Sequence, residues 1–292
     1  MQYTNKQGLP APLVALLTRD LYTKGKSQYS VTELISPPKV RKLRERYDDA
    51  ITIDVVDLID SKLGTLLHAK LENQNIEGHI LEERIFATVD ESIISGQIDL
   101  QREQDGGVVV IDYKLVKAYS VMNAKSDWTT QLNIYKWLVE TVKKVPVVGL
   151  QICAIVKDWS QHEKREGYPE AKAVMIDIPM MDNVAIETYI RSRLALHIDA
   201  EVSQDLGVDI KPCTPEERWM TETTYAVRRD GRQTAMRVFK SLEEAEAFMG
   251  DYKDRSIEER PGEPRRCKGN YCYVAQWCKQ YQEELKAKEN QA

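Results

Sequence analysis

The spacing of apolar residues changes along the chain and separates predicted helices from predicted strands. Apolar side chains recur at helical spacing over residues 61–73 and again over residues 127–144, which predicts two amphipathic helices. Between them, residues 82–101 predict two short strands with a turn near Asp90, and residues 106–116 form a β-branched run typical of a buried strand. The sequence therefore predicts a helix, three strands and a second helix, in this order.

Two further strands are predicted over residues 146–156 and 171–180, so helices and strands are mixed as in an α/β protein. The segment that follows is predicted to contain a long helix over residues 181–203, a second hairpin over residues 223–239 and a short helix that begins at a Ser241–Glu244 capping box. We expect an N-terminal extension (residues 1–27), an α/β core (residues 28–180) and a C-terminal lobe (residues 181–292).

The net charge of the chain argues against a uniformly basic protein that binds nucleic acid by charge alone. The 292 residues carry a net charge of −5, and the pI is near 5.6. Basic residues are nevertheless grouped, and such groups are typical either of a solvated surface or of a surface that tracks phosphates. The candidate DNA contacts are Lys39, Arg41 and Lys42, in a basic helix that begins at Pro38, and Arg228 and Arg229 in the second hairpin.

Hydropathy gives an expectation for the location of the protein. No apolar run approaches the roughly 20 residues that a membrane-spanning helix needs. The N-terminal segment has a short apolar patch without a basic start or a clean cleavage site, so no signal peptide is predicted. A cytoplasmic location is the expectation.

A carboxylate and a lysine at the end of one strand are the first candidates for chemistry. The Asp-x-Lys pattern itself occurs four times, beginning at Asp60, Asp112, Asp209 and Asp251. Only Asp112 and Lys114 end a predicted buried strand, where the period of two places both side chains on one face. Two charges in that position are costly unless they meet a metal, a partner or solvent.

Asp99 ends the preceding predicted strand and is the second candidate acid. The Asp105–Gly106 step predicts a tight turn, so the two strands are expected to be antiparallel neighbours. Counting outward from this turn places Asp99 opposite the residues around Asp112. A shift of at most one residue, as in a β-bulge, would make the two acids face each other. Adjacent carboxylates repel each other and favour a divalent cation such as Mg²⁺ or Mn²⁺. A structural salt bridge at the strand end is the alternative.

Three residues on the predicted helices could complete such a site. His68 can supply an imidazole ligand, although a single helical histidine is also an ordinary surface or core residue. Gln131 and Tyr135 are spaced i, i+4 and therefore share one helix face. They could support the site or contact a substrate backbone, or they could form the polar edge of an amphipathic helix.

The order of these motifs resembles the RecB-type branch of the PD-(D/E)XK nuclease superfamily. That branch carries a helical His, a strand Asp, an acid-x-Lys and a Gln-xxx-Tyr motif, and the chain matches them with His68, Asp99, Asp112-x-Lys114 and Gln131-xxx-Tyr135. The resemblance is close over residues 28–140, and SVTELISPP and LGTLLHAKLE are also similar to the opening of phage and prophage nucleases. It implies a restriction-endonuclease-like core, in which a central mixed β-sheet is flanked by helices.

The resemblance also implies a role for each residue. The ligands of Mg²⁺ or Mn²⁺ would be His68, Asp99, Asp112 and the backbone carbonyl of Tyr113. Lys114 would act in catalysis with the two acids, and Gln131 and Tyr135 would support the site or the DNA. Glu83 is a weaker candidate for a supporting role behind the ligands.

Four of the five cysteines lie in the last third of the chain, whereas Cys153 is expected in a buried strand. The spacing Cys267-x4-Cys272-x5-Cys278 resembles the tail of iron–sulfur nucleases in this superfamily, which take a fourth cysteine from before the nuclease core. This chain has no cysteine there, so Cys213 is the candidate fourth ligand. The resemblance implies a 4Fe–4S cluster that stabilises the lobe. Four thiolates also suit tetrahedral Zn²⁺, and the third alternative is that the cysteines bind no metal.

The function that these features predict is a Mg²⁺- or Mn²⁺-dependent DNA exonuclease that acts at ends or on single strands. The resemblance implies phage or prophage DNA recombination in the cytoplasm of a bacterial host, with a single-strand annealing protein as partner. One alternative is a non-catalytic DNA- or partner-binding protein with a cysteine-bound metal. Another is a structure-specific endonuclease with the same chemistry.

Overall fold

The computed structural model describes residues 1–19, 22–123, 126–269 and 271–290. The chain forms two compact units, each with its own packing. The first unit contains Met1–Pro38 and Asp48–Asp209, and the second contains Lys39–Tyr47 and Ile210–Ala292. The expected domain boundaries at residues 27 and 180 stay a prediction.

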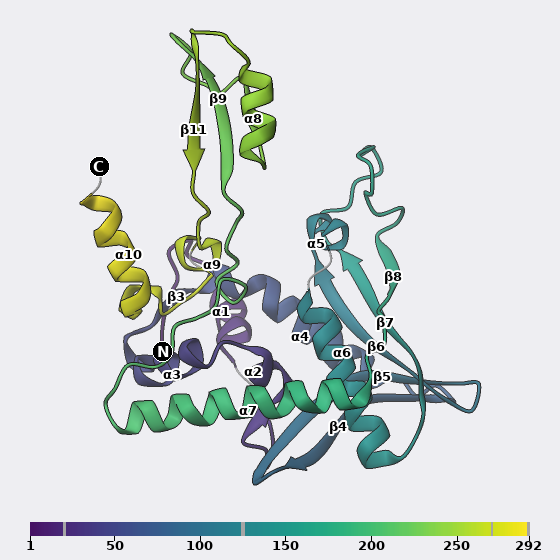
Figure 1. Cartoon of the computed structure of the whole chain (residues 1–292). Helices are drawn as coiled ribbons and strands as arrows, with labels where there is room; N and C mark the ends of the chain where they lie inside the picture. The colour runs from purple at the N-terminus through teal and green to yellow at the C-terminus, as the bar shows by residue number, and fades with distance from the viewer. Residues whose placement is uncertain (20–21, 124–125, 270, 291–292) are drawn as a thin grey trace. The chain divides into compact units, whose positions relative to one another are not determined.

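A mixed β-sheet forms the centre of the first unit (Figure 1). Its six strands are β2 (Tyr29–Ser30), β4 (His79–Val89), β5 (Ser92–Gln104), β6 (Gly107–Val116), β7 (Val147–Val156) and β8 (Ala173–Asp177). The β4–β5–β6 neighbours are antiparallel, β6 and β7 are parallel, and β7 and β8 are antiparallel. The predicted fold class, a central mixed sheet flanked by helices, is confirmed.

The turn chemistry of the sequence explains the hairpins of this sheet. Asp105 and Gly106 have φ angles of 49° and 78°, and a pair of positive φ angles matches the right-handed twist of the strands that such a turn joins. The predicted turn at Asp90 is also present, with φ at 52°. The strands on either side of it, β4 and β5, have 11 and 13 residues and are longer than the two short strands expected.

Helices cover one face of the sheet with a continuous apolar core. The core joins α2 (Val31–Ile35), α6 (Ser126–Leu138) and α7 (Asn183–Asp205) to inward-facing residues of the sheet such as Ile98 and Val110. The predicted helix over residues 127–144 is α6 followed by a π turn at Val139–Lys143. A different helix, α4 (Ile59–Leu71), carries His68 and contacts β6.

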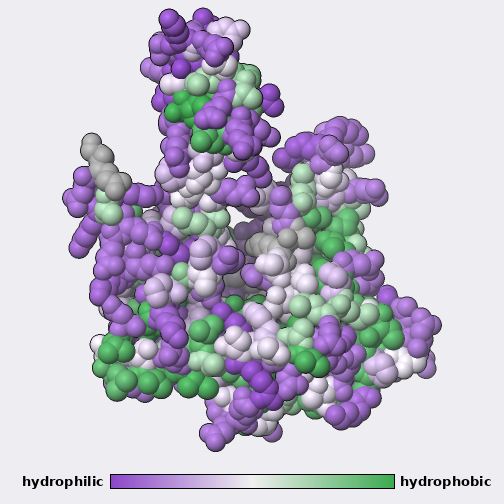
Figure 2. Space-filling model, in the orientation of Figure 1, coloured by the Kyte–Doolittle hydropathy of each residue, from purple (hydrophilic) through white to green (hydrophobic). Residues whose placement is uncertain are grey.

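Shorter elements complete the first unit. They are β1 (Gln2–Thr4), which pairs in parallel with β3 (Thr52–Asp54), α1 (Ala11–Thr18), α5 (Ala118–Met122) and the 3-10 turns Asp48–Ala50 and Val55–Leu58. Apolar side chains are exposed along the end of α7 and just beyond it, at Ile198, Val202, Leu206 and Val208 (Figure 2). None of the described helices is both long enough and apolar enough to cross a membrane.

The second unit is built around a small antiparallel sheet and the cysteines. The sheet has the order β10 (Arg237–Phe239), β9 (Thr224–Arg229), β11 (Arg255–Arg260), and α8 (Leu242–Met249) packs on it. The remaining helices are α3 (Pro38–Arg46), α9 (Arg265–Lys268), the 3-10 turn Ala275–Trp277 and α10 (Lys279–Glu289). The predicted hairpin and the helix start at Ser241 are confirmed, whereas β11 was not predicted.

Candidate active site

The β5–β6 hairpin brings the two predicted acids together. The β5–β6 ladder ends at the Leu100–Ile111 pair, and Asp99 and Asp112 are the next residues along the two strands. Asp99 Oδ2 accepts a 2.7 Å hydrogen bond from the backbone N–H of Tyr113. Both acids are buried, with Asp112 only 2% exposed. The chain therefore concentrates two carboxylates where water cannot screen their repulsion.

A group of three donors beside this pair has the composition of a metal site. The ligand atoms of His68, Glu82 and Asp99 lie within 4.8 Å of one another. His68 Nδ1 is 2.9 Å from Glu82 Oε1 and 3.4 Å from Asp99 Oδ1. One imidazole nitrogen with carboxylate oxygens suits Mn²⁺ well, and the carboxylates suit Mg²⁺.

Asp112 supplies an independent indication that a cation fits here. Its Oδ2 atom is buried and has no hydrogen bond among the described residues. The ammonium of Lys114 lies 2.7 Å from this atom as its ion-pair partner, and it lowers the pKa of Asp112 against the larger, opposite effect of burial. A carboxylate oxygen has further acceptor sites beyond one ammonium, which a metal ion or its bound water would occupy.

Gln131 connects the acid, the lysine and the tyrosine of the predicted set. Its Nε2 atom donates to Asp112 Oδ1 at 3.1 Å and to the Tyr135 hydroxyl at 2.8 Å. Its Oε1 atom accepts from Lys114 Nζ at 3.2 Å. The predicted residues from β6 and α6 thus form one hydrogen-bonded network, in which the amide fixes the position of Lys114 relative to Asp112.

Glu82 is the site residue that the sequence did not reveal. It lies inside β4, opposite Asp99, with φ at 50°, and Gln97 Nε2 donates to its carboxylate at 2.9 Å. A non-glycine residue in this backbone region is strained, and such strain is typical of functional positions. Glu83, the acid considered from the sequence, instead accepts hydrogen bonds from Gln101 and Lys143.

Burial and mutual repulsion change the protonation of this cluster. Burial first, and Asp112 second, raise the pKa of Asp99 from 3.8 to about 8. Burial also raises the pKa of Asp112. The hydrogen bond to Glu82 raises the pKa of His68 despite the opposing effect of burial. Without a cation, the carboxylate pair therefore retains a proton near neutral pH, and a divalent ion would compete with that proton.

A glycine lets the helix that carries Gln131 approach the sheet. A Cβ atom on Gly96 would lie 2.7 Å from Leu138 Cδ1 and 2.8 Å from Tyr135 Cε1. Both neighbours are buried side chains of α6. The close approach of β5 to α6 thus depends on the absence of a side chain at position 96, and it sets the position of the Tyr135 hydroxyl.

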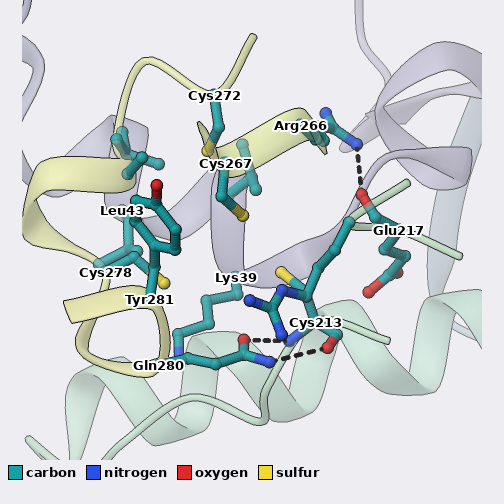
Figure 3. Close-up of a pocket in the computed structure, with 14 residues that line it drawn as sticks. Lys39, Leu43, Cys213, Glu217, Arg266, Cys267, Cys272, Cys278, Gln280 and Tyr281 are labelled. Carbon is teal, nitrogen blue, oxygen red and sulfur yellow. Dashed lines mark hydrogen bonds between the residues drawn. The ribbon is translucent and has the colours of Figure 1, made fainter. Parts of the chain in front are cut away.

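The four C-terminal cysteines line one cavity in the second unit (Figure 3). Cys213 is tied to the segment of the other three by Gln280, which accepts from the Cys213 N–H at 2.9 Å and donates to its carbonyl at 3.1 Å. Burial raises the pKa of the Cys213 thiol to about 12, and the Lys39 ammonium acts in the opposite direction. Cys153 is separate from the cavity, partly buried on β7 in the first unit.

The residues predicted to contact DNA form hydrogen bonds or ion pairs with other residues of the second unit. Lys39 is buried and donates to the Ile210 carbonyl. Arg41 and Lys42 both pair with Glu45, and in the hairpin Arg228 pairs with Glu258 and Arg229 with Asp254. The side chains of Arg228 and Arg229 remain 38% and 58% exposed. Their contact with DNA stays a prediction.

Comparison with known proteins shows which family the sequence matches. The sequence profile of the PD-(D/E)XK nuclease superfamily matches residues 77–279. The crystal structure of SSO0001 is similar at 18% identity and a TM-score of 0.45, over 63% of this chain and 84% of that one. A "putative exonuclease" from Eubacterium rectale is similar at 11% identity and a TM-score of 0.29, over 59% of this chain and 64% of that one. No curated protein matches the chain.

Proposed function

This chain belongs to the PD-(D/E)XK nuclease superfamily, and we propose that it is a Mg²⁺- or Mn²⁺-dependent DNA exonuclease of the RecB-type branch. The observation that carries the proposal is the buried Asp99–Asp112 pair, with the Lys114 ammonium 2.7 Å from Asp112 Oδ2. A structural salt bridge would not need a second acid, a histidine and a strained glutamate at the same point.

The acids and the histidine would hold the metal. His68, Glu82 and Asp99 offer one ligand atom each, and Asp112 and the Tyr113 carbonyl complete the proposed set. The ion, when bound, would lower the pKa of a water molecule and stabilise charge on the phosphate. Asp99 is oriented for this role by the N–H of Tyr113, and Glu82 by the amide of Gln97.

Lys114 is the proposed catalytic cation. Its ammonium lies between Asp112 and the Gln131 carbonyl oxygen, so it is held at the edge of the acid pair. There it would orient the attacking water or neutralise charge on the phosphate in the transition state. Gln131, fixed by the Tyr135 hydroxyl, would keep the ammonium in this position.

The substrate we propose is DNA with an end or a single-stranded segment. Phosphate contacts by Lys39, Arg41, Lys42, Arg228 and Arg229 were expected from the sequence, and the two exposed arginines of the hairpin are the better candidates. Phosphate contacts release counterions, so binding should weaken steeply with salt. A role in phage or prophage recombination with a single-strand annealing partner rests on the resemblance of the N-terminal segments.

The cysteine cavity is the proposed site of a 4Fe–4S cluster, with Zn²⁺ as the alternative. Four thiolates suit either centre, and the choice of 4Fe–4S rests on the resemblance of the cysteine spacing to that of iron–sulfur nucleases in this superfamily. Such a centre would fix Cys213 to the C-terminal segment and so stabilise the lobe.

Digestion of linear and covalently closed DNA tests the proposed function. With Mg²⁺ or Mn²⁺ the parent chain should degrade linear DNA and leave closed circles intact, and a chelator should abolish degradation. The Lys114→Ala variant should bind DNA but not cleave it. Cleavage of closed circles would identify an endonuclease instead. Binding without any metal-dependent cleavage would support the non-catalytic alternative and contradict the proposal.

A further inference from the structure

Three basic side chains line the cysteine cavity together with the four thiols. They are Lys39, Arg218 and Arg266, whereas Glu217 is the one acid among the described lining residues (Figure 3). Lys39 and Arg218 are buried, with 8% and 7% of their surface exposed. Burying a cation is costly unless negative charge lies close by. The cavity therefore carries more positive charge than its carboxylates balance.

Arg218 has a donor that the protein leaves unused. Its two terminal nitrogens bind the Glu284 carboxylate at 2.7 Å and 2.5 Å. Its Nε atom is buried and has no hydrogen-bond partner among the described residues. The side chain lies beside Cys267, and interactions with Glu284 first and with the Cys267 thiol after it raise the pKa of the guanidinium. Glu284 thus holds the outer edge of the guanidinium, while Nε is left for an acceptor at the cavity.

The other two cations approach the cavity from different elements. Arg266, next to Cys267 in α9, donates to the Glu217 carbonyl at 3.2 Å, and its Nε atom is also buried without a partner among the described residues. Lys39, in α3, donates to the Ile210 carbonyl at 3.2 Å, three residues before Cys213. Two guanidinium N–H groups without acceptors and a buried ammonium beside thiols indicate that an anion completes the cavity.

We propose that Arg218, Lys39 and Arg266 form a cationic cradle that retains a dianionic tetrathiolate metal centre, with Arg218 Nε donating to the sulfur of Cys267. The inference rests on the proposed cysteine-bound metal. Four thiolates around Zn²⁺ or around a 4Fe–4S core carry a net charge of about −2. The three cations reduce this charge, although Glu284 already balances part of the charge of Arg218. Hydrogen bonds to charged acceptors are about twice as strong as neutral ones, so Arg218 is the main positioning residue.

The cradle also assigns Lys39 to the metal centre, whereas the sequence had grouped it with the DNA contacts. Its ammonium is buried at the cavity and would not reach a phosphate without leaving its position beside Ile210. Lys39→Gln should therefore weaken metal retention more than it weakens the binding of DNA. Lys240→Gln provides the matched control, because Lys240 is an exposed lysine of the same unit that does not line the cavity.

Metal retention by the full chain tests the cradle. The parent and the variants are purified without oxygen, their iron, sulfide and zinc contents are measured, and the rate of metal loss to a chelator is followed. Arg218→Gln should lose metal about 10–100-fold faster, the range for residues that orient metal ligands. Arg218→Lys should restore part of the retention because it keeps the charge, and Lys240→Gln should match the parent. Circular dichroism of each variant separates these effects from loss of the fold.

The possible results distinguish the cradle from the metal centre itself. The parent chain could contain metal while the folded Arg218→Gln variant loses its metal at a rate within twofold of the parental rate. This result would overturn the cradle but not the metal centre. A parent chain without iron or zinc would overturn the cysteine-bound centre and the cradle together. Neither result bears on nuclease activity, which is assayed separately on linear DNA.

Discussion

Protonation of Asp99 makes the stability of the metal-free chain depend on pH in an unusual direction. The pKa of this carboxyl is about 8 in the folded chain, mainly because of burial and then because of Asp112, against an ordinary value of 3.8. The folded state therefore holds a proton that the unfolded state releases. Its contribution to stability is fully present below about pH 4 and is lost as the pH rises toward 8.

The size of the effect follows from the pKa difference. Each pH unit between the two pKa values costs about 1.4 kcal/mol of unfolding free energy. Between about pH 5.5 and pH 7.5 the Asp99 carboxyl should therefore remove about 3 kcal/mol. Asp112, whose pKa is raised in the same direction, adds to this trend. Asp99→Asn cannot titrate, so this variant should lack the contribution of Asp99.

Hydrogen exchange of the β5 and β6 amides measures this stability in the unit that contains the site. The parent and Asp99→Asn are compared at each pH in the presence of a chelator, so that intrinsic exchange rates cancel. Protection in the parent should fall relative to the variant as the pH rises. Saturating Mn²⁺ should flatten the trend in the parent, because the ion takes the place of the proton.

Equal pH dependence in the parent and Asp99→Asn would refute the reasoning. It would mean that Asp99 is ionised in the metal-free chain at neutral pH and that burial does not dominate its protonation. A parent that becomes more protected relative to the variant as the pH rises would reverse the sign and contradict it more strongly.

Three further predictions concern residues around the acid pair. Glu82→Gln should weaken Mn²⁺ binding at least about tenfold, as measured by calorimetry, because it removes a charged ligand atom. A Mn²⁺ affinity within twofold of the parent would exclude Glu82 from the ligand set. Gly96→Ala should lower the free energy of unfolding by about 1–3 kcal/mol and slow cleavage, because the added Cβ displaces Tyr135. An unchanged urea unfolding curve and an unchanged cleavage rate would contradict this packing. Tyr135→Phe should lower kcat with little change in KM, because Gln131 loses the hydroxyl that positions it. A change in KM alone would instead assign Tyr135 to substrate binding.

The part of the site that follows local rules could be predicted from the sequence. The Asp105–Gly106 turn fixes the register of the hairpin, whose ladder ends at Leu100 and Ile111, the neighbours of Asp99 and Asp112. The i, i+4 spacing of Gln131 and Tyr135 likewise fixes their contact on one turn of α6. In these cases the structure is set by a few neighbouring residues, so the pattern contains the necessary information.

The parts that depend on long-range packing could not be predicted. Glu82 and Glu83 are adjacent and chemically identical, and the register of β4 against β5 decides which of them lies beside Asp99 and His68. Lys39 belongs to a basic helix by composition, yet packing places it at the cysteine cavity. Strand β11, Arg255–Arg260, is too polar for strand periodicity and forms because β9 offers it a pairing edge.

Cleavage of end-labelled linear DNA by two matched variants tests the central claim most directly. Asp112-Tyr113-Lys114 and Asp251-Tyr252-Lys253 are the same tripeptide, but the first is in the buried strand β6 and the second is exposed. With Mn²⁺, Asp112→Asn should abolish cleavage and retain DNA binding, whereas Asp251→Asn should cleave at the parental rate. Parental cleavage by a folded Asp112→Asn variant would contradict the assignment of the acid pair as the metal-dependent active site.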